Sequence, residues 1–200
     1  MDHDYYRRTK CSAEGCTARV LTGATACWEH LDDREAYVKG LDFAKLDGAN
    51  LAGVDLSGRD LQEASLNEAC LSGANLSGAN LLRAGLYRAW LDDANLQGAN
   101  FNEAFMKFAV LGGADASAAS FIGANLEQTN LVGTKAQGAI FDGADLYYAR
   151  PGNADMEGAS FKNSNITRTI FRRANLAKAN LGGATGQANY DRANLEGAQQ

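Results

Sequence analysis

The sequence predicts an all-β solenoid, a chain wound into stacked coils, on the basis of three observations. A large apolar residue, leucine or phenylalanine in most places, returns every five residues from Leu46 to Leu181. Two residues before it, alanine fills 23 of the 29 places between residues 44 and 184. A period of five matches neither the 3.6 residues of a helical turn nor the two-residue alternation of a strand. Two inward residues in every five therefore indicate a solenoid that turns a corner at each repeat.

Each unit reads small, Asn or Asp, large apolar and then two variable residues, as in Ala74-Asn75-Leu76-Ser77-Gly78. This pattern resembles the pentapeptide-repeat family, whose consensus is A-(D/N)-L-x-x. The resemblance implies a right-handed quadrilateral β-helix with four repeats, hence 20 residues, in each coil and about eight coils in all. We therefore expect two domains, a small cap over residues 1–40 and a β-helix over residues 41–200.

The spacing of phenylalanine provides an independent test of the 20-residue coil. Phenylalanine recurs at this interval at Phe101, Phe121, Phe141 and Phe161, so these side chains should stack on one face. We number the faces by their central residues, with Leu61 on the first, Leu66 on the second, Leu71 on the third and Leu76 on the fourth.

The residue at each corner differs between faces. Glycine recurs there on the third and fourth faces, as at Gly73 and Gly78, whereas the second face has Glu68, Arg88 and Phe108. Glycine is favoured where φ is positive. We therefore expect type II turns after the third and fourth faces and a different turn after the second.

The N-terminal segment contains the pattern C-x4-C-x10-C-x2-H, formed by Cys11, Cys16, Cys27 and His30. Two close pairs of thiolate and imidazole ligands can surround one tetrahedral zinc ion. The pattern resembles short zinc knuckles that accompany some bacterial nucleases and phage-type proteins. We expect structural zinc, the alternative being unligated thiols, and we interpret Cys70 as a free surface thiol.

A short helix should follow the knuckle and cover the first coil. Asp32 with Glu35 three residues later has the form of a capping box, and Gly40 would end the helix. Arg59 occupies a place where alanine belongs, and we expect its guanidinium to bond turn carbonyls. At the other end, the segment from Ala184 to Gln187 is one residue short, which predicts a distorted last coil and leaves homodimerisation open.

The composition argues against an enzyme and against a membrane protein. The chain has two histidines, His3 and His30, and no phosphate-binding loop or nucleophile elbow. The segment from Met1 to Lys10 is polar, and no run of residues reaches transmembrane length. We therefore expect a non-enzymatic cytoplasmic protein.

Two functions fit the remaining surface. Some members of the resembled family imitate DNA and bind bacterial type II topoisomerases such as DNA gyrase, and residues 41–160 hold 15 acidic and 7 basic side chains. On the fourth face, Asn75, Asn95 and Lys135 are interspersed with acidic residues and reduce the negative charge. We therefore favour a protein partner that binds the aromatic and basic residues of the second face. Exposed aromatic residues beside arginine are enriched at interfaces. The candidate contact residues are Tyr87, Arg88, Trp90, Phe105, Lys107, Phe108, Tyr147 and Tyr148.

Overall fold

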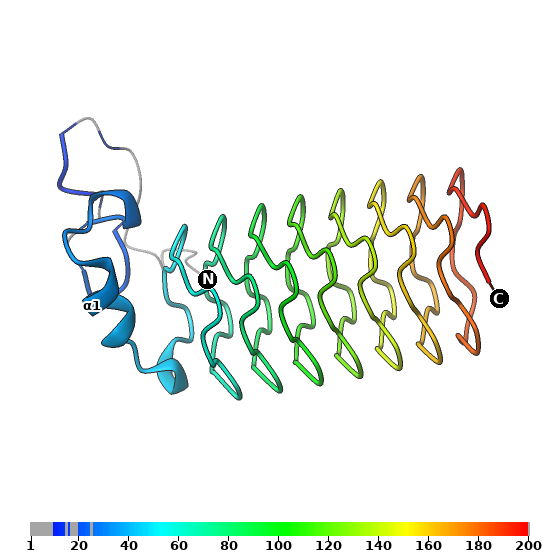
Figure 1. The fold of residues 1–200 in the computed structure, drawn as a ribbon, viewed down its shortest axis with the longest axis horizontal. Coiled ribbons are helices and arrows are strands. Elements are labelled where there is room, and N and C mark those ends of the chain that lie inside the picture. Colours follow the sequence, from blue (N-terminus) through cyan, green and yellow to red (C-terminus); the bar gives the residue numbers. More distant parts are fainter. Residues whose placement is uncertain (1–9, 15, 17–19, 25, 200) are drawn as a thin grey trace, which may run out of the picture.

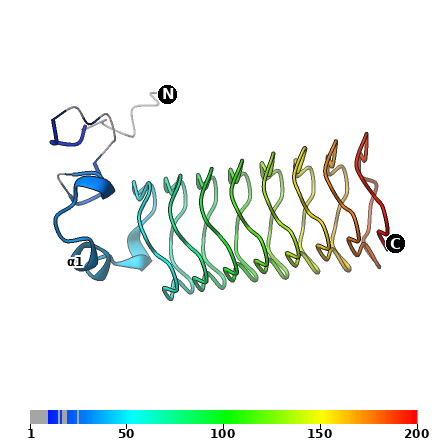
Figure 2. The same ribbon diagram turned by 45° about the horizontal axis from the view of Figure 1, so that its top comes forward.

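The structure is a computed structural model that describes residues 10–14, 16, 20–24 and 26–199. Stacked coils form a rod, and the N-terminal segment with its one α-helix covers one end of it (Figure 1). A second view shows the same stacking from the first coil to the C-terminus (Figure 2). Residues 1–9, which include His3, lie outside the described residues.

Parallel bridges between residues 20 apart hold neighbouring coils together. Asn75 bridges to Asn95, and Asn95 bridges in turn to Asp115. The backbone amide of Leu76 donates to the carbonyl of Asn95 at 2.7 Å, and equivalent bonds repeat along the rod. In the described part of the chain, each face contributes an isolated bridge rather than a longer strand, because a corner follows every fifth residue. The β-solenoid and its 20-residue coil are thereby confirmed.

The central residues and the small residues two places earlier form one core along the rod. Leu76, Ala79 and Leu81 are fully buried, as their places in the repeat predict. The predicted phenylalanine stack is confirmed, with ring centroids 5.1 Å apart between Phe101 and Phe121 and an interplanar angle of 5°. The next two pairs are 4.9 Å apart. Side chains at equivalent positions of successive coils therefore pack against one another along the core.

Polar residues that replace alanine in the core are all hydrogen-bonded to backbone. The hydroxyl of Thr129 donates to the carbonyl of Met106 at 3.0 Å, and that of Thr134 to Leu111 at 2.8 Å. Ser164 and Thr169 do the same with Phe161 and Leu146. These bonds offset the cost of burying a hydroxyl group.

The prediction of a different corner after the second face is wrong. Arg88 and Phe108 have φ values of 54° and 63°, close to the 63° of Gly78 on the fourth face. The bridges on both sides fix the path of the backbone through each corner, so the residue there takes a positive φ whatever its side chain. Bulky residues at the second corner consequently carry backbone strain that glycine would avoid.

The N-terminal region forms three short helices, η1 (Trp28–His30), α1 (Arg34–Lys39) and η2 (Phe43–Lys45). Helix α1 has Gly40 as its C-cap residue, as predicted. Its N-cap is Asp33, whose carboxylate accepts from the amide of Ala36 at 2.9 Å. The predicted capping box of Asp32 and Glu35 is therefore displaced by one residue.

Arg59 does not have the predicted contacts. Its side chain is exposed and lines a hollow between α1 and the first coil, together with Trp28, Arg34 and Asp55. Its backbone amide donates to the carbonyl of Leu56, and no bond from its guanidinium to a turn carbonyl occurs in the described structure. An end coil has a neighbour on one side only, so an arginine there can turn outward.

The predicted slip near the C-terminus is confirmed by the bridges. Asn165 pairs with Thr185, 20 residues later, but Ile170 pairs with Asn189, 19 residues later. The missing residue thus falls between Thr185 and Asn189, and the ladder resumes beyond it. Among the described residues, no helix has the length and apolar character needed to cross a membrane. The cytoplasmic location stays a prediction.

Candidate functional site

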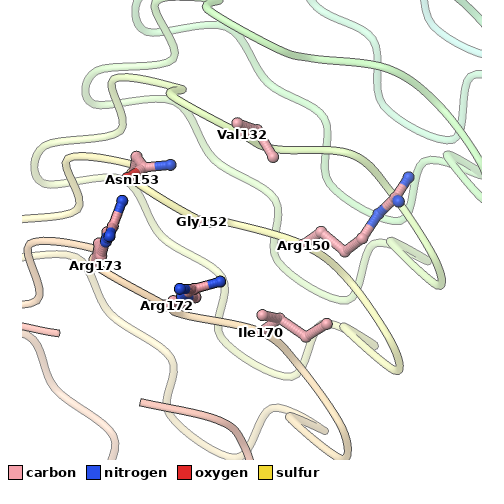
Figure 3. A pocket seen from close by; sticks show the side chains of 7 residues that line it. All are labelled: Val132, Arg150, Gly152, Asn153, Ile170, Arg172 and Arg173. Carbon is pink, nitrogen blue, oxygen red and sulfur yellow. The ribbon is translucent and has the colours of Figure 1, made fainter. Parts of the chain in front are cut away.

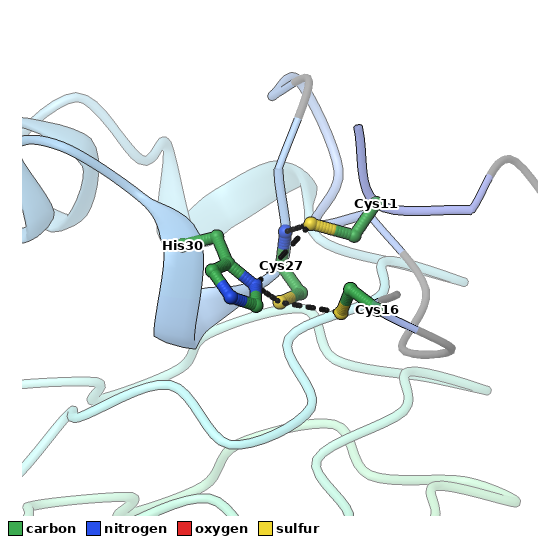
Figure 4. A group of neighbouring side chains, drawn as sticks. All are labelled: Cys11, Cys16, Cys27 and His30. Carbon is green, nitrogen blue, oxygen red and sulfur yellow. Dashed lines mark hydrogen bonds between the residues drawn. The ribbon is translucent and has the colours of Figure 1, made fainter. Parts of the chain in front are cut away.

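The predicted metal ligands Cys11, Cys16, Cys27 and His30 lie together beside the first coils (Figure 4). One ligand atom from each residue lies within 4.8 Å of the other three. The Sγ atoms of Cys16 and Cys27 are 3.8 Å apart. The Nδ1 atom of His30 is 3.6 Å from Sγ of Cys11 and 3.3 Å from Sγ of Cys27.

These separations fit a tetrahedral zinc ion. Zinc–sulfur bonds of about 2.3 Å at tetrahedral angles separate two sulfur atoms by about 3.8 Å. Zinc–nitrogen bonds of about 2.0 to 2.1 Å place a ring nitrogen about 3.6 Å from sulfur. Three of the separations, 3.3, 3.6 and 3.8 Å, are close to these values, so the four residues suit a zinc ion.

Local structure explains why the four side chains meet. Cys27 is the N-cap residue of η1 and His30 its last residue, so one short helical turn places their side chains on the same side. Cys11 and Cys27 are buried, Cys16 is half-buried and His30 is exposed, so the cluster lies at the surface of the cap. The backbone amide of Cys27 donates to the sulfur of Cys11 at 3.5 Å. This bond lowers the pKa of the Cys11 thiol to about 6, which favours the thiolate that binds metal.

Cys70 lies outside this cluster. It is half-buried on the third face, where it bridges to Asn50 and Trp90. Its thiol lies 3.7 Å from the hydroxyl of Ser72. Cys70 is therefore not part of the predicted metal site.

Four of the eight candidate contact residues form a compact group, which we call the Phe108 cluster: Tyr87, Arg88, Lys107 and Phe108. The rings of Tyr87 and Phe108 meet edge to face with centroids 5.8 Å apart. The guanidinium of Arg88 lies 5.1 Å from the Tyr87 ring and 5.8 Å from the Phe108 ring. The amine of Lys107 lies 5.2 Å from the Phe108 ring. Cation–π contacts thus hold the cluster at the corner after the second face.

A second group, the Tyr148 cluster, consists of Tyr147, Tyr148 and Arg168. The two tyrosine rings meet at 89° with centroids 4.8 Å apart. The guanidinium of Arg168 lies 5.0 Å from the Tyr148 ring and donates to its hydroxyl. Arg168 is not among the eight candidate contact residues, although its position 20 residues after Tyr148 places it beside that ring in the next coil.

The coil that carries Glu127 separates the two clusters. Lys107 forms an ion pair with Glu127 at 2.7 Å, and this bond lowers the pKa of the Glu127 carboxyl. The amide of Gln128 also donates to the Glu127 carboxylate. The two clusters are therefore neighbours along one corner of the rod, two coils apart, rather than one continuous aromatic surface.

Trp90 and Phe105 lie on different faces of the rod. Trp90 bridges to Val110 on the third face and is 53% exposed, whereas Phe105 bridges to Asn125 on the second face and is 60% exposed. Within the described part of the chain, no ring contact joins either of them to the Phe108 cluster. They flank that cluster on its two sides.

The acidic residues of the fourth face are engaged within the rod. Asn75 donates to the carboxylate of Asp55 at 3.0 Å, and Gln137 donates to Asp155 at 2.7 Å. Hydrogen bonds from Ser57, together with those from Asn75, lower the pKa of Asp55. Both carboxylates thus already have hydrogen-bond partners within the rod.

Three comparisons relate the chain to known proteins. No curated protein matches it. Among solved structures, it is similar to HetL, a pentapeptide repeat protein involved in heterocyst differentiation regulation from the cyanobacterium Nostoc sp. strain PCC 7120, with 25% identity over 84% of this chain and 97% of HetL and a TM-score of 0.42. It is similar to QnrB1, a plasmid-mediated fluoroquinolone resistance protein, with 17% identity over 80% of this chain and 86% of that one and a TM-score of 0.39. It is also similar to a pentapeptide repeat protein from the Arabidopsis thaliana thylakoid lumen, with 27% identity, coverages of 68% and 79%, and a TM-score of 0.32.

The repeats themselves match the family described as pentapeptide repeats. Eight copies are found, within residues 44–81, 79–115, 90–128, 109–147 and 153–185. These segments cover well over half of the sequence. The chain therefore belongs to the pentapeptide-repeat family.

Proposed function

We propose that this protein is a non-enzymatic interaction solenoid that binds a protein partner along the corner after the second face. Pentapeptide-repeat proteins are generally structural or interaction proteins, which supports the general role. The Phe108 and Tyr148 clusters supply the contact, with Trp90 and Phe105 on either side. A zinc ion held by Cys11, Cys16, Cys27 and His30 folds the cap and takes no part in chemistry.

The observation that carries the proposal is the pair of aromatic and cationic clusters along one corner of the rod, with Arg88 exposed in one and Tyr148 in the other. Phe108 and Tyr148 occupy corners with φ of 63° and 56°. Glycine would fit these corners without strain, as it does at Gly78, yet the chain places large rings there. Tyr148 is 39% exposed, so burial in the core does not compensate for this strain. Polar residues such as Glu63 and Lys178 take the same φ at other corners, so the binding role rests on the aromatic and cationic composition of the clusters.

The Phe108 cluster has the composition of an interface anchor. Rings and a guanidinium group hold one another in place, so little side-chain freedom is lost when a partner covers them. Arg88 is exposed above both rings, where it can reach a carbonyl or carboxylate of the partner. Aromatic residues and arginine dominate interface hot spots.

A DNA-like surface that binds DNA gyrase is the second candidate. The excess of 15 acidic over 7 basic side chains in residues 41–160 favours it. The ladder bonds to Asp55 and Asp155 weigh against it, because these carboxylates already have partners along the fourth face. Long-range charge is screened by salt, whereas an aromatic anchor depends on short-range burial. The two candidates therefore differ in their response to salt.

The test is partner capture with the parent protein and a double variant, Phe108→Glu with Tyr148→Ala. The variant should fold normally and lose the partner, and binding by the parent should depend only weakly on salt. Ile122→Glu is the control, since Ile122 is an exposed apolar residue at a different corner. Inhibition of gyrase supercoiling by the parent at low but not high salt, retained in the double variant, would instead establish the second candidate.

A further inference from the structure

A hollow of about 200 Å³ lies on the third face near the C-terminal end, just past the corner that carries the Tyr148 cluster. Figure 3 shows the side chains around it. It is lined by Val132, Arg150, Gly152, Asn153, Ile170, Arg172 and Arg173. Three of these seven residues are arginines, which distinguishes this part of the rod from the acidic coils that precede it.

The hollow exists because one coil lacks a side chain at this corner. Val132, Gly152 and Arg172 occupy the same place in three successive coils. Because Gly152 has no side chain, its backbone forms the floor of the hollow between the side chains of Val132 and Arg172. A Cβ atom built on Gly152 would meet the carbonyl of Arg172 at 3.6 Å, an ordinary contact, so the glycine is not required by packing.

The charge of the hollow is only partly balanced by the protein. Arg172 forms an ion pair with Asp191 at 3.2 Å. Arg150 and Arg173 are exposed, and neither has a carboxylate partner among the described residues. Three guanidinium groups and one carboxylate leave the site with two uncompensated positive charges. Residues 161–200 as a whole carry 6 basic and 2 acidic side chains, so the surrounding surface does not neutralise it.

Arg173 also occupies a strained corner. Its φ is 59°, in a column where Gly113 and Gly133 take the same conformation without strain. In Figure 3 its side chain lies next to Asn153, Arg172 projects between Arg173 and Ile170, and the guanidinium of Arg150 extends away from both. The exposed Arg150 side chain has rotatable bonds that allow it to turn toward a ligand in the hollow.

We infer that this hollow binds a phosphate monoester. A phosphate monoester carries close to two negative charges at neutral pH, which matches the two unpaired guanidinium groups. Arginine pairs with phosphate oxygens through two parallel hydrogen bonds. The organic part of the ligand contacts Ile170 and Val132, the latter 44% exposed. The phosphate monoester could be supplied by a phosphorylated side chain of a partner protein or by a small soluble phosphate ester.

The test is calorimetric titration with phenyl phosphate, which carries both the dianion and an apolar ring. The parent protein should bind it, and Arg150→Gln and Arg173→Gln should each weaken binding about tenfold or more, the effect of losing a charged hydrogen bond. Lys162→Gln removes the same charge from an exposed site at a different corner and should leave binding unchanged.

A second variant separates a pocket from general charge attraction. Gly152→Val fills the floor with the residue that Val132 already places in the preceding coil, and it keeps every charge. It should abolish binding of phenyl phosphate while leaving the unfolding transition in place. Equal binding by Gly152→Val and the parent, or equal affinity for phenyl sulfate, which has one charge less, would overturn the inference.

The two sources are separated with a short peptide containing phosphotyrosine between glycines. Tighter binding of this peptide than of phenyl phosphate would assign the site to a phosphorylated protein. Equal or weaker binding would assign it to a small phosphate ester. No binding of either probe to the parent would overturn the inference.

Discussion

Asn50 and Thr22 are bonded to each other across the boundary between the cap and the first coil. The amide of Asn50 donates to the hydroxyl of Thr22 at 2.7 Å, and the amide of Thr22 donates to the carbonyl of Asn50 at 3.0 Å. Leu21, next to Thr22, is buried in the same core as the coils. Leu21 and Thr22 thus cover part of the backbone edge of the first coil, which would otherwise be exposed.

One zinc ion per chain is expected in purified protein. Metal analysis by plasma mass spectrometry should give this stoichiometry, and Cys27→Ser should lower it because a thiolate ligand is lost. Cys70→Ser is the matched control, since Cys70 is remote from the cluster, and its zinc content should equal that of the parent. Unchanged zinc in Cys27→Ser would exclude the predicted site.

Removal of the metal should loosen the first coil and spare the middle of the rod. A strong chelator should increase hydrogen exchange at the amides of Thr22 and Asn50, because both bonds join the first coil to Thr22, which lies in the segment that the metal holds. The amide of Phe121, bonded to the carbonyl of Ile140, should exchange as slowly as before. Uniform loss of protection would instead mean that the whole solenoid depends on the metal.

Phe121→Ala should lower the free energy of unfolding by roughly 3 to 5 kcal/mol, because it leaves a cavity in a stack of rings. Phe105→Ala is the control, as Phe105 is exposed and its loss should cost less than about 1 kcal/mol. Urea denaturation followed by circular dichroism measures both. Similar losses from the two substitutions would contradict the inward orientation of Phe121.

A pair of exchanges in the fourth-face corner should have opposite effects on stability. Gly98 and Ala118 occupy the same place with φ of 63° and 57°. Gly98→Ala should destabilise by about 1 to 2 kcal/mol, the cost of a left-handed residue with a Cβ atom. No atom lies within 4 Å of that Cβ position, so the cost arises from the backbone alone.

Ala118→Gly should raise the free energy of unfolding by up to about 1 kcal/mol, since the relief of strain exceeds the entropy that glycine loses. The same denaturation experiment measures it. A loss of stability in Ala118→Gly would show that chain entropy outweighs corner strain in this fold.

The core and the grouping of Cys11, Cys16, Cys27 and His30 could be predicted because each depends on residue type and spacing. Phe101 and Phe121 are placed by their spacing, since every inward position of a repeating coil meets the same position one coil later. The spacing of Cys27 and His30 suits one helical turn, which the structure contains as η1. Residue types and intervals are sufficient for both features.

The corner after the second face and the orientation of Arg59 could not be predicted in the same way. At Phe108 the bridges of neighbouring coils determine φ, and this constraint outweighs the preference of the side chain. Arg59 turns outward because its coil lies at the end of the stack, and the sequence of its own unit does not contain this information. The ion pair between Lys107 and Glu127 was not predicted either, because it joins residues of two successive coils.

The 20-residue bridge interval makes the length of this protein adjustable in fixed steps. Among residues 26–199, Asn75 bridges to Asp55 and Asn95 alone, so a whole coil could be duplicated or deleted by recombination with the other ladder bonds preserved. The single residue missing before Asn189 lies close to the last coil, where few later coils inherit the shifted register. Gain or loss of whole coils can therefore change the distance between the cap and the last coil while the sequences of both ends stay the same.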